Sequence, residues 1–452
     1  MSDKVLVRRY QGDDMIFSGL RRLELTAVPQ LRRAAVDGAT LDAAARIVQD
    51  VRDRGEAALR HHAERLGDLA AGEPLFRTRA DMLAALDGIS TADRDVLERT
   101  ADRIRAFAQS QRSTLGDLDV AVPGGRAGHT VVPVVRAGCY APGGRFPLPS
   151  SVLMTAVTAR VAGVPEVIVA SPRPAKATLA AAAVAGADIL LAAGGAHAIA
   201  AMAYGAGPVP PCDAIVGPGN RWVTAAKQLV SGPVVIDMLA GPSELVVLAD
   251  GTADPDVVAA DLIAQAEHDP DALPILVTTA GETFACAVDD AIARRLVDLP
   301  TAATAIPALQ NGFTVLAPDL DAAIAVCDRL APEHLEVKTL DPKAVAARLR
   351  HYGALFVGSA SAEVFGDYGA GPNHVLPTGG TARSMGGLSV LTFLRVRTWL
   401  CLDDAAPLLD DAARLARMEG LEGHARAAEA RKVIREPVPG FSHATAALKE
   451  SK

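Results

Sequence analysis

Aromatic residues, paired cysteines and basic runs are scarce in this sequence, and each scarcity limits what the protein can be. Aromatics make up 4% of the 452 residues, so any buried core must consist mainly of Ala, Val, Leu and Ile. The five cysteines form no C-x-x-C pair, which favours reduced thiols over a disulfide framework. A net charge of −8 without a Lys/Arg cluster argues against nucleic acid or an acidic membrane as a partner.

The sequence also lacks an obvious targeting or membrane-spanning segment. The first thirty residues carry acidic positions and no apolar h-region, so we expect no signal peptide. The most apolar stretch, residues 177–201, is mostly Ala and Gly and is interrupted by Asp188, which favours a buried helix followed by a strand. We therefore expect a soluble, cytoplasmic protein.

What the sequence does contain is a long alternation of short apolar runs with helical runs. A chain of 452 residues is too long for one compact core, so two or more domains are expected. Residues 30–120 have a charged, helical pattern, with apolar positions at helical spacing in Leu41–Arg54 and Ala92–Arg112. Beyond them, β-branched runs alternate with Ala-rich helices, which indicates parallel sheets covered on both faces.

The predicted fold is therefore α/β, with two doubly wound, Rossmann-like parallel-sheet domains and helical N-terminal and C-terminal extensions. The predicted strands are Val132–Val135, Val167–Ala170, Ile189–Leu191, Ala214–Val216, Val234–Ile236, Leu245–Leu248, Ile275–Thr278, Phe313–Leu316 and Ala354–Val357. The predicted helices between them are Ser151–Val161, Ala175–Val184, Ala196–Tyr204, Trp222–Val230, Asp256–His268, Thr283–Leu299, Leu320–Leu330 and Lys343–Arg350. The expected domains are 1–30 as an extension, 31–134 with 242–384 as a main domain, 135–241 as a second domain, and 385–452 as a helical tail.

Three glycine-rich junctions, Gly138–Gly144, Gly194–Gly195 and Gly217–Asn220, are candidates for phosphate binding. Glycine lets the backbone approach an anion, and a helix N-terminus offers free N–H groups. In doubly wound sheets such ligands collect at the carboxyl ends of strands, where we expect the functional motifs to lie. Tight turns alone would also explain these glycines. The G-x-G-x-x-G fingerprint is absent, so the glycines suggest cofactor binding without establishing it.

A histidine and a glutamine at the end of one predicted helix are candidate metal ligands. Asp254 is a suitable N-cap with Pro255 after it, and a proline two residues beyond His268 stops the helix. Gln265 and His268 are three residues apart and so share a helix face. A histidine in the last turn is also explained as a simple cap.

Three further segments, Pro332–His334, Gly366–His374 and Glu419–His424, each place an acid near a histidine. Nitrogen and oxygen donors of this kind suit zinc, and the same residue types perform acid–base catalysis. Surface decoration is the alternative explanation, which spacing alone does not exclude.

At these residues the sequence resembles the histidinol dehydrogenase family, over about residues 25–435. The matching motifs, in order, are Pro142–Gly144, Pro149–Met154, Gly217–Asn220, Ala240–Glu244, Gln265–His268, Ala331–His334, Gly366–Tyr368 and Gly371–Gly380. The resemblance implies a zinc-dependent, four-electron oxidation of L-histidinol to L-histidine through histidinaldehyde, with two NAD. These are the last two steps of histidine biosynthesis.

The resemblance also implies roles for particular residues. The implied zinc ligands are Gln265, His268, Asp367 and His424, which would hold the substrate's imidazole and amino nitrogens. The implied substrate contacts are these four together with Ser243, His334, His374 and Glu419. His334 would be the general base for the hydroxyl proton and Glu333 the residue that activates water.

The resemblance places these metal and acid–base residues in the main domain and the NAD contacts in the second. The implied NAD contacts are Tyr140, His197 and Asn220. It further implies a homodimer in which the tails are exchanged, so that Glu419 and His424 complete the partner's site.

Three departures from the family pattern keep alternatives open. His197 stands where the family usually has Gln, which changes the available hydrogen bonds. Gly144–Leu148 resembles sister dehydrogenases of sulfonated diols, and Leu394–Cys401 is atypical at a tail that forms the dimer. The first alternative is thus an NAD-dependent dehydrogenase for a sulfonated or polyhydroxylated alcohol. The second is a zinc-containing binding protein that has lost turnover.

Overall fold

The computed structural model describes residues 10–12, 15–28, 30–31, 36–70, 72–143 and 146–433. The chain divides into two compact units. Unit 1 comprises Met1–Arg112 and Pro133–Phe393, and unit 2 comprises Ser113–Val132 and Leu394–Lys452. Gly144, which belongs to three of the segments named above, and Arg145, which belongs to one, lie outside the described residues.

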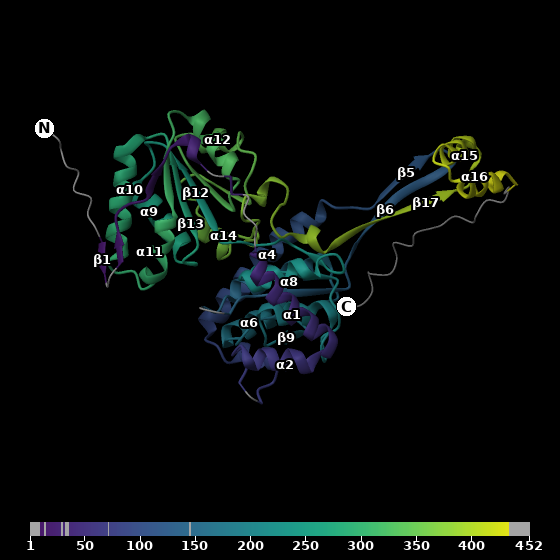
Figure 1. The fold of residues 1–452 in the computed structure, drawn as a ribbon, viewed down its shortest axis with the longest axis horizontal. Helices are drawn as coiled ribbons and strands as arrows, with labels where there is room; N and C mark the ends of the chain where they lie inside the picture. Colours follow the sequence, from purple (N-terminus) through teal and green to yellow (C-terminus); the bar gives the residue numbers. More distant parts are fainter. Residues whose placement is uncertain are drawn as a thin grey trace. The chain divides into compact units, whose positions relative to one another are not determined.

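Unit 1 contains two six-stranded sheets, each in its own lobe (Figure 1). The first has the order β11-β10-β7-β8-β9-β4, parallel except for β4. Its strands are β4 (Phe76–Thr78), β7 (Arg136–Tyr140), β8 (Glu166–Ala170), β9 (Ile189–Leu191), β10 (Ala214–Val216) and β11 (Val235–Ile236). Its crossover helices are α5 (Pro149–Ala162), α6 (Lys176–Ala185), α7 (Gly195–Tyr204) and α8 (Arg221–Val230).

The second sheet is wholly parallel, in the order β16-β15-β12-β13-β14-β3. Its strands are β3 (Arg21–Leu23), β12 (Glu244–Ala249), β13 (Leu273–Thr278), β14 (Phe313–Leu316), β15 (His334–Lys338) and β16 (Ala354–Val357). Its helices are α9 (Pro255–Ala266), α10 (Gly281–Leu296), α11 (Ala302–Asn311), α12 (Leu320–Leu330), α13 (Pro342–Ala346) and α14 (Glu363–Asp367).

Both sheets wind in the same sense, which confirms the predicted fold class. In each, the chain runs outward from a central strand through two further strands and then returns to the central strand's other side. The reversal falls between β7 and β10 in the first sheet and between β12 and β15 in the second. Such a reversal opens a crevice at the end of the sheet, where ligands of doubly wound folds bind.

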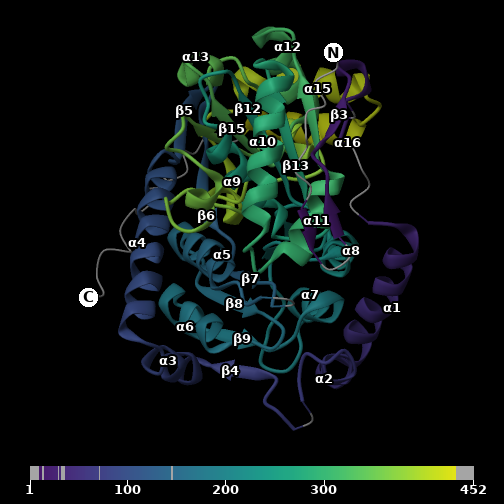
Figure 2. The ribbon, with the colours of Figure 1, turned by 90° about the vertical axis from the view of Figure 1, so that its left-hand side faces the viewer.

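The central strand β12 shows why the sequence folds this way. All six of its residues are buried. Leu245 and Val247 belong to one core and Val246 and Leu248 to another, since successive side chains of a strand point to opposite faces. Helices α9, α10 and α11 cover one of these faces (Figure 2). A strand covered on both faces therefore needs a continuous apolar run.

The first three amino-terminal helices pack on the first sheet and not on the second, so the predicted assignment of 31–134 to the main domain is wrong for this part of the range. Ala44, Val48 and Leu59 share one core with α7 and α8, and β4 pairs with β9. These helices are α1 (Gly38–Arg54), α2 (Glu56–Arg65) and α3 (Arg79–Asp87), whereas α4 (Thr91–Ser113) contacts the segment after α14, where Arg103 donates to the carbonyl oxygen of Gly369. An amphipathic pattern shows that a helix buries one face, but not which sheet receives it.

Unit 2 is a three-stranded sheet with two helices, so the tail is not entirely helical as predicted. Its elements are β5 (Leu118–Val122), β6 (Gly125–Pro133), β17 (Leu394–Leu402), α15 (Leu409–Met418) and α16 (Glu422–Glu429), with strand order β17-β6-β5. β17 joins a strand from more than 250 positions earlier, and the local pattern does not reveal that pairing. The predicted strand Val132–Val135 in fact spans the end of β6 and the link to β7.

The remaining elements are short. They are β1 (Tyr10–Gly12), β2 (Met15–Phe17) and the 3-10 helices η1 (Leu25–Ala27), η2 (Thr381–Arg383), η3 (Val390–Phe393), η4 (Ala406–Leu408) and η5 (Ala430–Val433). Within the described ranges, no helix combines the length and the hydrophobicity that crossing a bilayer requires.

The turn after β10 yields a stability prediction. Gly217 has φ +117°, and a Cβ atom there would lie 2.0 Å from the carbonyl oxygen of Tyr140. We expect Gly217→Ala to lower the free energy of unfolding by about 3 kcal/mol, through backbone strain and this clash. Urea denaturation measures it. Gly38→Ala, which meets nothing within 4 Å, is the control. Equal stability of the two variants would contradict the prediction.

Candidate active site

The predicted site residues lie at the carboxyl ends of the strands in the first sheet and at the amino ends of the strands in the second. Tyr140 ends β7, and the loops Gly194–Gly195 and Gly217–Asn220 lead from β9 and β10 into helices, all at carboxyl ends of strands as expected. Glu244 and His334, however, are the first residues of β12 and β15. The acid–base motif therefore lies at the amino edge of the second sheet, contrary to the prediction. Loops at the two edges of a sheet have similar compositions, so the sequence does not distinguish them.

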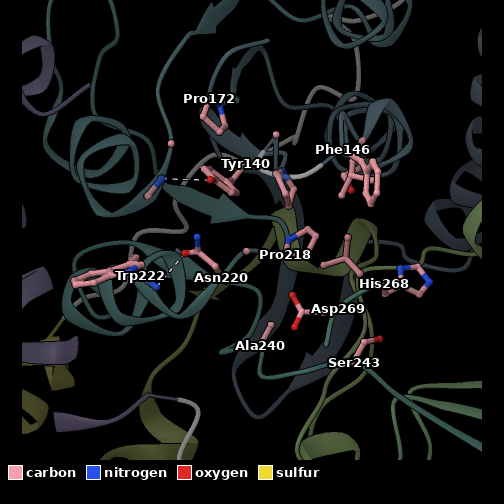
Figure 3. Close-up of a pocket in the computed structure, with 18 of the residues that line it drawn as sticks. Tyr140, Phe146, Pro172, Pro218, Asn220, Trp222, Ala240, Ser243, His268 and Asp269 are labelled. Atoms are coloured by element: carbon pink, nitrogen blue, oxygen red, sulfur yellow. Dashed lines mark hydrogen bonds between the residues drawn. The ribbon is translucent and has the colours of Figure 1, made fainter. Parts of the chain in front are cut away.

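These two edges line one cleft of about 1990 Å³. Tyr140 and Asn220 contribute from the first sheet, and Ser243, His268 and Glu333 from the second. Figure 3 shows side chains from both walls directed into this space. Pockets for a single small ligand usually measure about 300–1,000 Å³, so this cleft has room for two molecules side by side.

On the first wall, hydrogen bonds fix the glycine loops. The N–H of Gly195 donates to the Tyr140 hydroxyl at 3.3 Å, and Asn220 Oδ1 accepts from the N–H of Trp222 at 3.0 Å (Figure 3). Asn220 is thus the N-cap of α8. The N-terminal turns of α7 and α8 line the cleft, and those of their first N–H groups that Tyr140 and Asn220 do not accept are suited to bind an anion there.

The loop after β10 is also held by a buried ion pair. Lys227 and Asp237 lie within ion-pairing distance, and both are buried. Asp237 accepts the N–H of Gly217 at 2.7 Å, while Lys227 donates to the carbonyl oxygen of Gly217 at 3.0 Å. Both polar groups of this glycine are therefore fixed in place before any ligand arrives.

His197, the departure from the family pattern, is 1% exposed and lines the same wall. Its Nε2 lies 3.0 Å from the carboxylate of Asp68, which also accepts the N–H of Gly194 at 2.7 Å. His197 Nδ1 has no hydrogen-bond partner among the described residues. The imidazole thus ties the α7 loop to Asp68 and leaves one nitrogen available.

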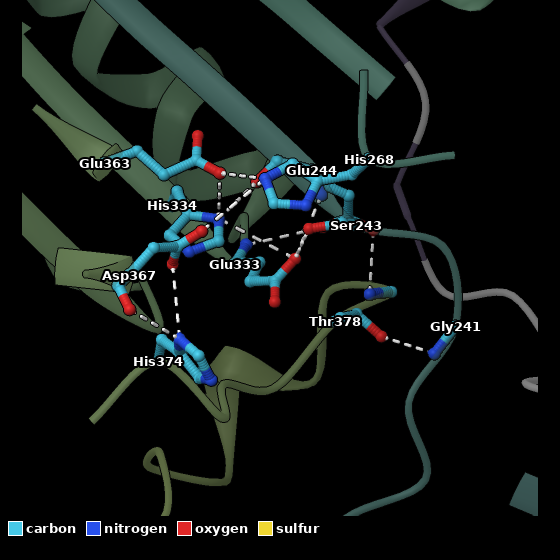
Figure 4. Close-up of polar contacts among 11 residues, drawn as sticks. Gly241, Ser243, Glu244, His268, Glu333, His334, Glu363, Asp367, His374 and Thr378 are labelled. Atoms are coloured by element: carbon cyan, nitrogen blue, oxygen red, sulfur yellow. Dashed lines mark hydrogen bonds and ion pairs between the residues drawn. The ribbon is translucent and has the colours of Figure 1, made fainter. Parts of the chain in front are cut away.

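On the second wall, Glu333 is buried and hydrogen bonded. Its carboxylate accepts from the hydroxyl of Ser243 and, at 3.1 Å, from the N–H of Glu244 (Figure 4). Burial raises the pKa of Glu333 well above its usual value, and the nearby charges of Glu244 and Glu363 raise it further. Glu333 is therefore a carboxyl group that can hold a proton and release it within the cleft.

His334 is a neutral imidazole of defined orientation. Burial lowers its pKa to about 3, and the positive charge of His268 adds to this effect. Its Nδ1 lies 3.3 Å from the carbonyl oxygen of Glu244, an acceptor, so the proton belongs on Nδ1. Nε2 then carries a lone pair, and it has no partner among the described residues. That nitrogen is a candidate general base.

Beside this pair lies a group of possible metal ligands. His268 Nε2 is 3.6 Å from Glu363 Oε1 and 3.5 Å from Asp367 Oδ2, and donor atoms of all three residues lie within 4.8 Å of one another. Burial raises the pKa of Asp367 to about 6, against the opposing effect of His268. One imidazole and two carboxylates are a donor set that fits zinc.

Gln265 lies on α9 three residues before His268, and His374 lies beside Asp367. Gln265 is completely buried, and neither of its side-chain polar atoms has a hydrogen-bond partner among the described residues. Such an unsatisfied amide is costly and is typical of a site that awaits a ligand. His374 Nδ1 lies 3.1 Å from the carbonyl oxygen of Asp367, and burial lowers the pKa of His374 to about 4.

The structure thus gathers six predicted residues in one place, namely Ser243, His268, Glu333, His334, Asp367 and His374 (Figure 4). The predicted NAD contacts Tyr140, His197 and Asn220 line the other wall. Glu419 and His424 do not belong to this cluster; they are exposed residues of unit 2, at the end of α15 and on α16.

Sequence reasoning missed Glu363, which stands beside the predicted residues. It precedes Asp367 by four positions, which places two acids on one face of a helical turn. Two like charges at this spacing repel each other, and this signal could have identified the pair.

Comparisons with known proteins agree with this architecture. A crystal structure of histidinol dehydrogenase from Elizabethkingia anophelis matches with a TM-score of 0.85 and 29% identity, over 91% of this chain and 98% of that one. The protein is therefore of the class with two Rossmann-like sheets around a shared cleft. The family model for histidinol dehydrogenase matches residues 31–432.

Curated relatives support the same assignment. The histidinol dehydrogenase of Thermus thermophilus is 46% identical over 389 residues, which cover 85% of this chain and 93% of the relative. That of Bordetella parapertussis is 44% identical over 417 residues, 90% of this chain and 94% of the relative. The chain belongs to the histidinol dehydrogenase family, whose members are oxidoreductases.

The buried imidazole of His334 predicts a pH-dependent stability. Its folded pKa of about 3 lies below the unfolded value near 6.5, so the unfolded chain takes up a proton first as the pH falls. We expect the free energy of unfolding to fall by about 2 kcal/mol as the pH is lowered from 7 to 5, because of His334 alone. Urea titrations of the metal-free protein and of His334→Asn would measure this. Parallel pH curves for the two proteins would contradict it.

Proposed function

We propose that this protein is a histidinol dehydrogenase, which oxidises L-histidinol to L-histidine through histidinaldehyde with two molecules of NAD. The observation that carries the proposal is the neutral, buried His334, with a free Nε2, beside a proton-holding Glu333 in the cleft. Identities of 41–46% to curated histidinol dehydrogenases support the choice of substrate. We propose the cytoplasm as its location.

His334 and Glu333 divide the proton transfers between them. In the first oxidation, Nε2 of His334 takes the hydroxyl proton of the alcohol as a hydride leaves the same carbon. The aldehyde is then hydrated when Glu333, in its ionised form, removes a proton from water as the water oxygen attacks the carbonyl carbon. Protonated His334 returns its proton to the former carbonyl oxygen, which leaves it neutral for the next step. In the second oxidation, His334 takes a hydroxyl proton of the hydrate as a second hydride leaves. NAD, when bound, accepts each hydride.

The substrate would be held on the second wall. Ser243 and His374 line the cleft on either side of the acid–base pair, and the hydroxyl of Ser243, which contacts Glu333, can turn to a ligand. Zinc, when bound, would hold the imidazole and amino nitrogens of the substrate. Gln265, His268 and Asp367 would bind the ion, together with His424 of the partner subunit. The unpartnered amide of Gln265 supports this assignment.

On the first wall, Tyr140, His197 and Asn220 would contact NAD. Support comes from the pre-formed glycine loops and from the free Nδ1 of His197. His197 tied to Asp68 can accept one hydrogen bond from the cofactor, where a glutamine could also donate one.

A homodimer would bring Glu419 and His424 to the partner's cleft. Unit 2 carries several large apolar side chains that are exposed in the single chain, including Val396 (62%), Leu400 (63%) and Met418 (77%). Apolar groups gathered on a small unit are typical of an interface. We therefore propose that a second copy of this chain covers them.

The central prediction concerns stoichiometry. Purified protein with limiting L-histidinol and excess NAD should form two NADH per histidinol, followed at 340 nm. Dialysis against a chelator should abolish this activity and added zinc should restore it. Dihydroxypropanesulfonate, the substrate of the competing hypothesis, should give no NADH. One NADH per histidinol, or preference for the sulfonate, would overturn the proposal.

The base assignment is tested by replacement. His334→Asn should lower turnover by roughly 10²–10⁴-fold, because the hydroxyl proton then has no acceptor. Zinc content, measured by elemental analysis, should equal that of the unmodified protein. The matched control is His351→Asn, a histidine outside the cleft lining, which should retain full turnover. Normal turnover in His334→Asn would remove His334 from the mechanism.

A further inference from the structure

The segment that follows α14 carries His374, a proposed substrate contact, and both of its ends are held on the second lobe, which contains the second sheet. At one end stands Asp367, the last residue of α14. Near the other end, the N–H of Gly379 donates to the carboxylate of Glu244 at 2.8 Å. We call residues 368–380 the substrate loop, because it belongs to the lobe that would bind the substrate.

In its middle, the substrate loop is hydrogen bonded to the first lobe. The side-chain amide of Asn373 donates from Nδ2 to the carbonyl oxygen of Met154 at 2.8 Å and to the hydroxyl oxygen of Thr158 at 3.2 Å. Both acceptors belong to α5, a crossover helix of the first sheet. All residues of α5 from Ser151 to Ala159 are buried, so this helix is a rigid anchor.

The neighbours of Asn373 determine which end of its amide faces α5. Its Oδ1 accepts the N–H of Val375 at 3.0 Å, so the NH₂ group points the other way, towards α5. The hydroxyl of Thr158 donates its own proton to the carbonyl oxygen of Met154 at 2.6 Å, which leaves its lone pairs to accept from Asn373. Asn373→Asp would therefore keep the bond to Val375 but lose both bonds to α5.

Helix α4 holds the same loop from a second side. The guanidinium group of Arg103 donates to the carbonyl oxygen of Gly369. Two residues later, Gly371 has φ +122°, and a Cβ atom there would lie 3.1 Å from the carbonyl oxygen of Arg103. The loop backbone therefore packs directly on α4, and contacts outside the second sheet set its position.

The placement of this loop matters because the two reactants would bind on different walls of the cleft. His334 and His374 line the cleft from the second lobe, and Tyr140 and Asn220 from the first. Reacting atoms must approach to about 3–3.5 Å, and a misplacement of about 1 Å can cost about 100-fold in rate. Asn373 precedes His374 directly and joins the two lobes, so its bonds to α5 influence the distance between the reactants.

We propose that Asn373 is a positioning residue for hydride transfer, which anchors the substrate loop to α5 and so sets the distance between the bound alcohol and the cofactor. Its side chain is not part of the cleft lining, so it acts through His374 and the loop backbone. The inference rests on the proposed function for the identity of the reactants. It gives Asn373 no part in metal binding or proton transfer.

The test is a stopped-flow measurement of NADH formation in a single turnover, with protein in excess over histidinol and saturated with zinc and NAD. Asn373→Asp should slow the first hydride transfer by roughly 10–100-fold, because both bonds to α5 are lost. The matched control is Asn311→Asp. Asn311 also donates to a carbonyl oxygen, that of Pro270 at 2.9 Å, but this bond lies within the second lobe. The control should react as fast as the unmodified protein.

Binding and exchange measurements separate positioning from a general structural defect. Asn373→Asp should keep its zinc content, and its affinities for NAD alone and for histidinol alone should equal those of the unmodified protein, because each wall keeps its own groups. Hydrogen–deuterium exchange of the loop amides, measured by mass spectrometry without ligands, should be faster in Asn373→Asp and unchanged in Asn311→Asp.

Thr158→Val removes part of the same contact from the side of α5. Asn373 then keeps its bond to Met154, so we expect a smaller fall in the first-turnover rate than in Asn373→Asp. The double variant should be no slower than Asn373→Asp alone, because the two side chains act through one contact. If Asn373→Asp does not fold, Thr158→Val decides the question, and an unchanged rate with unchanged exchange would overturn the inference.

The inference and the proposed function fail in different ways. A first-turnover rate in Asn373→Asp equal to that of the unmodified protein would overturn the inference. A slow rate accompanied by loss of zinc or of histidinol affinity would also overturn it, since that pattern describes a structural residue. The proposed function fails if the unmodified protein forms no NADH from histidinol. The same variants would then be compared with dihydroxypropanesulfonate as substrate, which would still decide the role of Asn373.

Discussion

The concentration of buried acids at the amino edge of the second sheet is the constraint on which the site depends. Glu244, Glu333, Glu363 and Asp367 are all less than 9% exposed, and burial raises the pKa of the last three. Taking so many carboxyl groups out of water opposes folding unless protons, hydrogen bonds or a cation offset the cost. The structure uses two different solutions. Glu244 and Glu333 accept backbone and hydroxyl hydrogen bonds, whereas Glu363 and Asp367 converge on His268. A packed apolar sheet supplies the rigidity that keeps these groups together.

The two sheets wind in the same sense, but they line the cleft with opposite edges. The first presents carboxyl ends, where glycine loops lead into helix N-termini suited to an anion. The second presents amino ends, so its helices arrive at the cleft with their C-terminal turns. This explains why His268 follows the last turn of α9: partial negative charge at a helix C-terminus favours a cation. The two halves of the cleft thus differ in electrostatic character because of strand direction alone. One wall is suited to phosphate groups and the other to a metal ion or an ammonium group.

Regular periodicity made the fold predictable, and long-range pairing limited the prediction. The strands Ala214–Val216, Phe313–Leu316 and Ala354–Val357 agree with the structure residue for residue, because buried parallel strands need continuous apolar runs. The sequence pattern identifies helix α1 but not the sheet that receives it. It predicts helix where strand β17 lies, because the partner strand β6 is remote in sequence. In the site, motifs identify most residues. The four-residue spacing of Glu363 and Asp367 marks a pair of acids, but only the coordinates show that the Glu363 carboxyl group has no hydrogen-bond partner among the described residues.

The orientation of the base follows from strand register, which connects core packing to chemistry. β12 and β15 pair in parallel with His334 opposite Leu245. This register sets the carbonyl oxygen of Glu244 3.3 Å from His334 Nδ1, and an acceptor at that nitrogen fixes the tautomer. The Nε2 atom is therefore left without a proton because the apolar strands β12 and β15 pair in one register. A shift of one residue would exchange the faces of the strand and direct the imidazole into the apolar core that receives Leu335. The hydrophobic pattern of β12 and β15 thus determines which nitrogen can accept a proton, although none of its residues needs to touch the substrate.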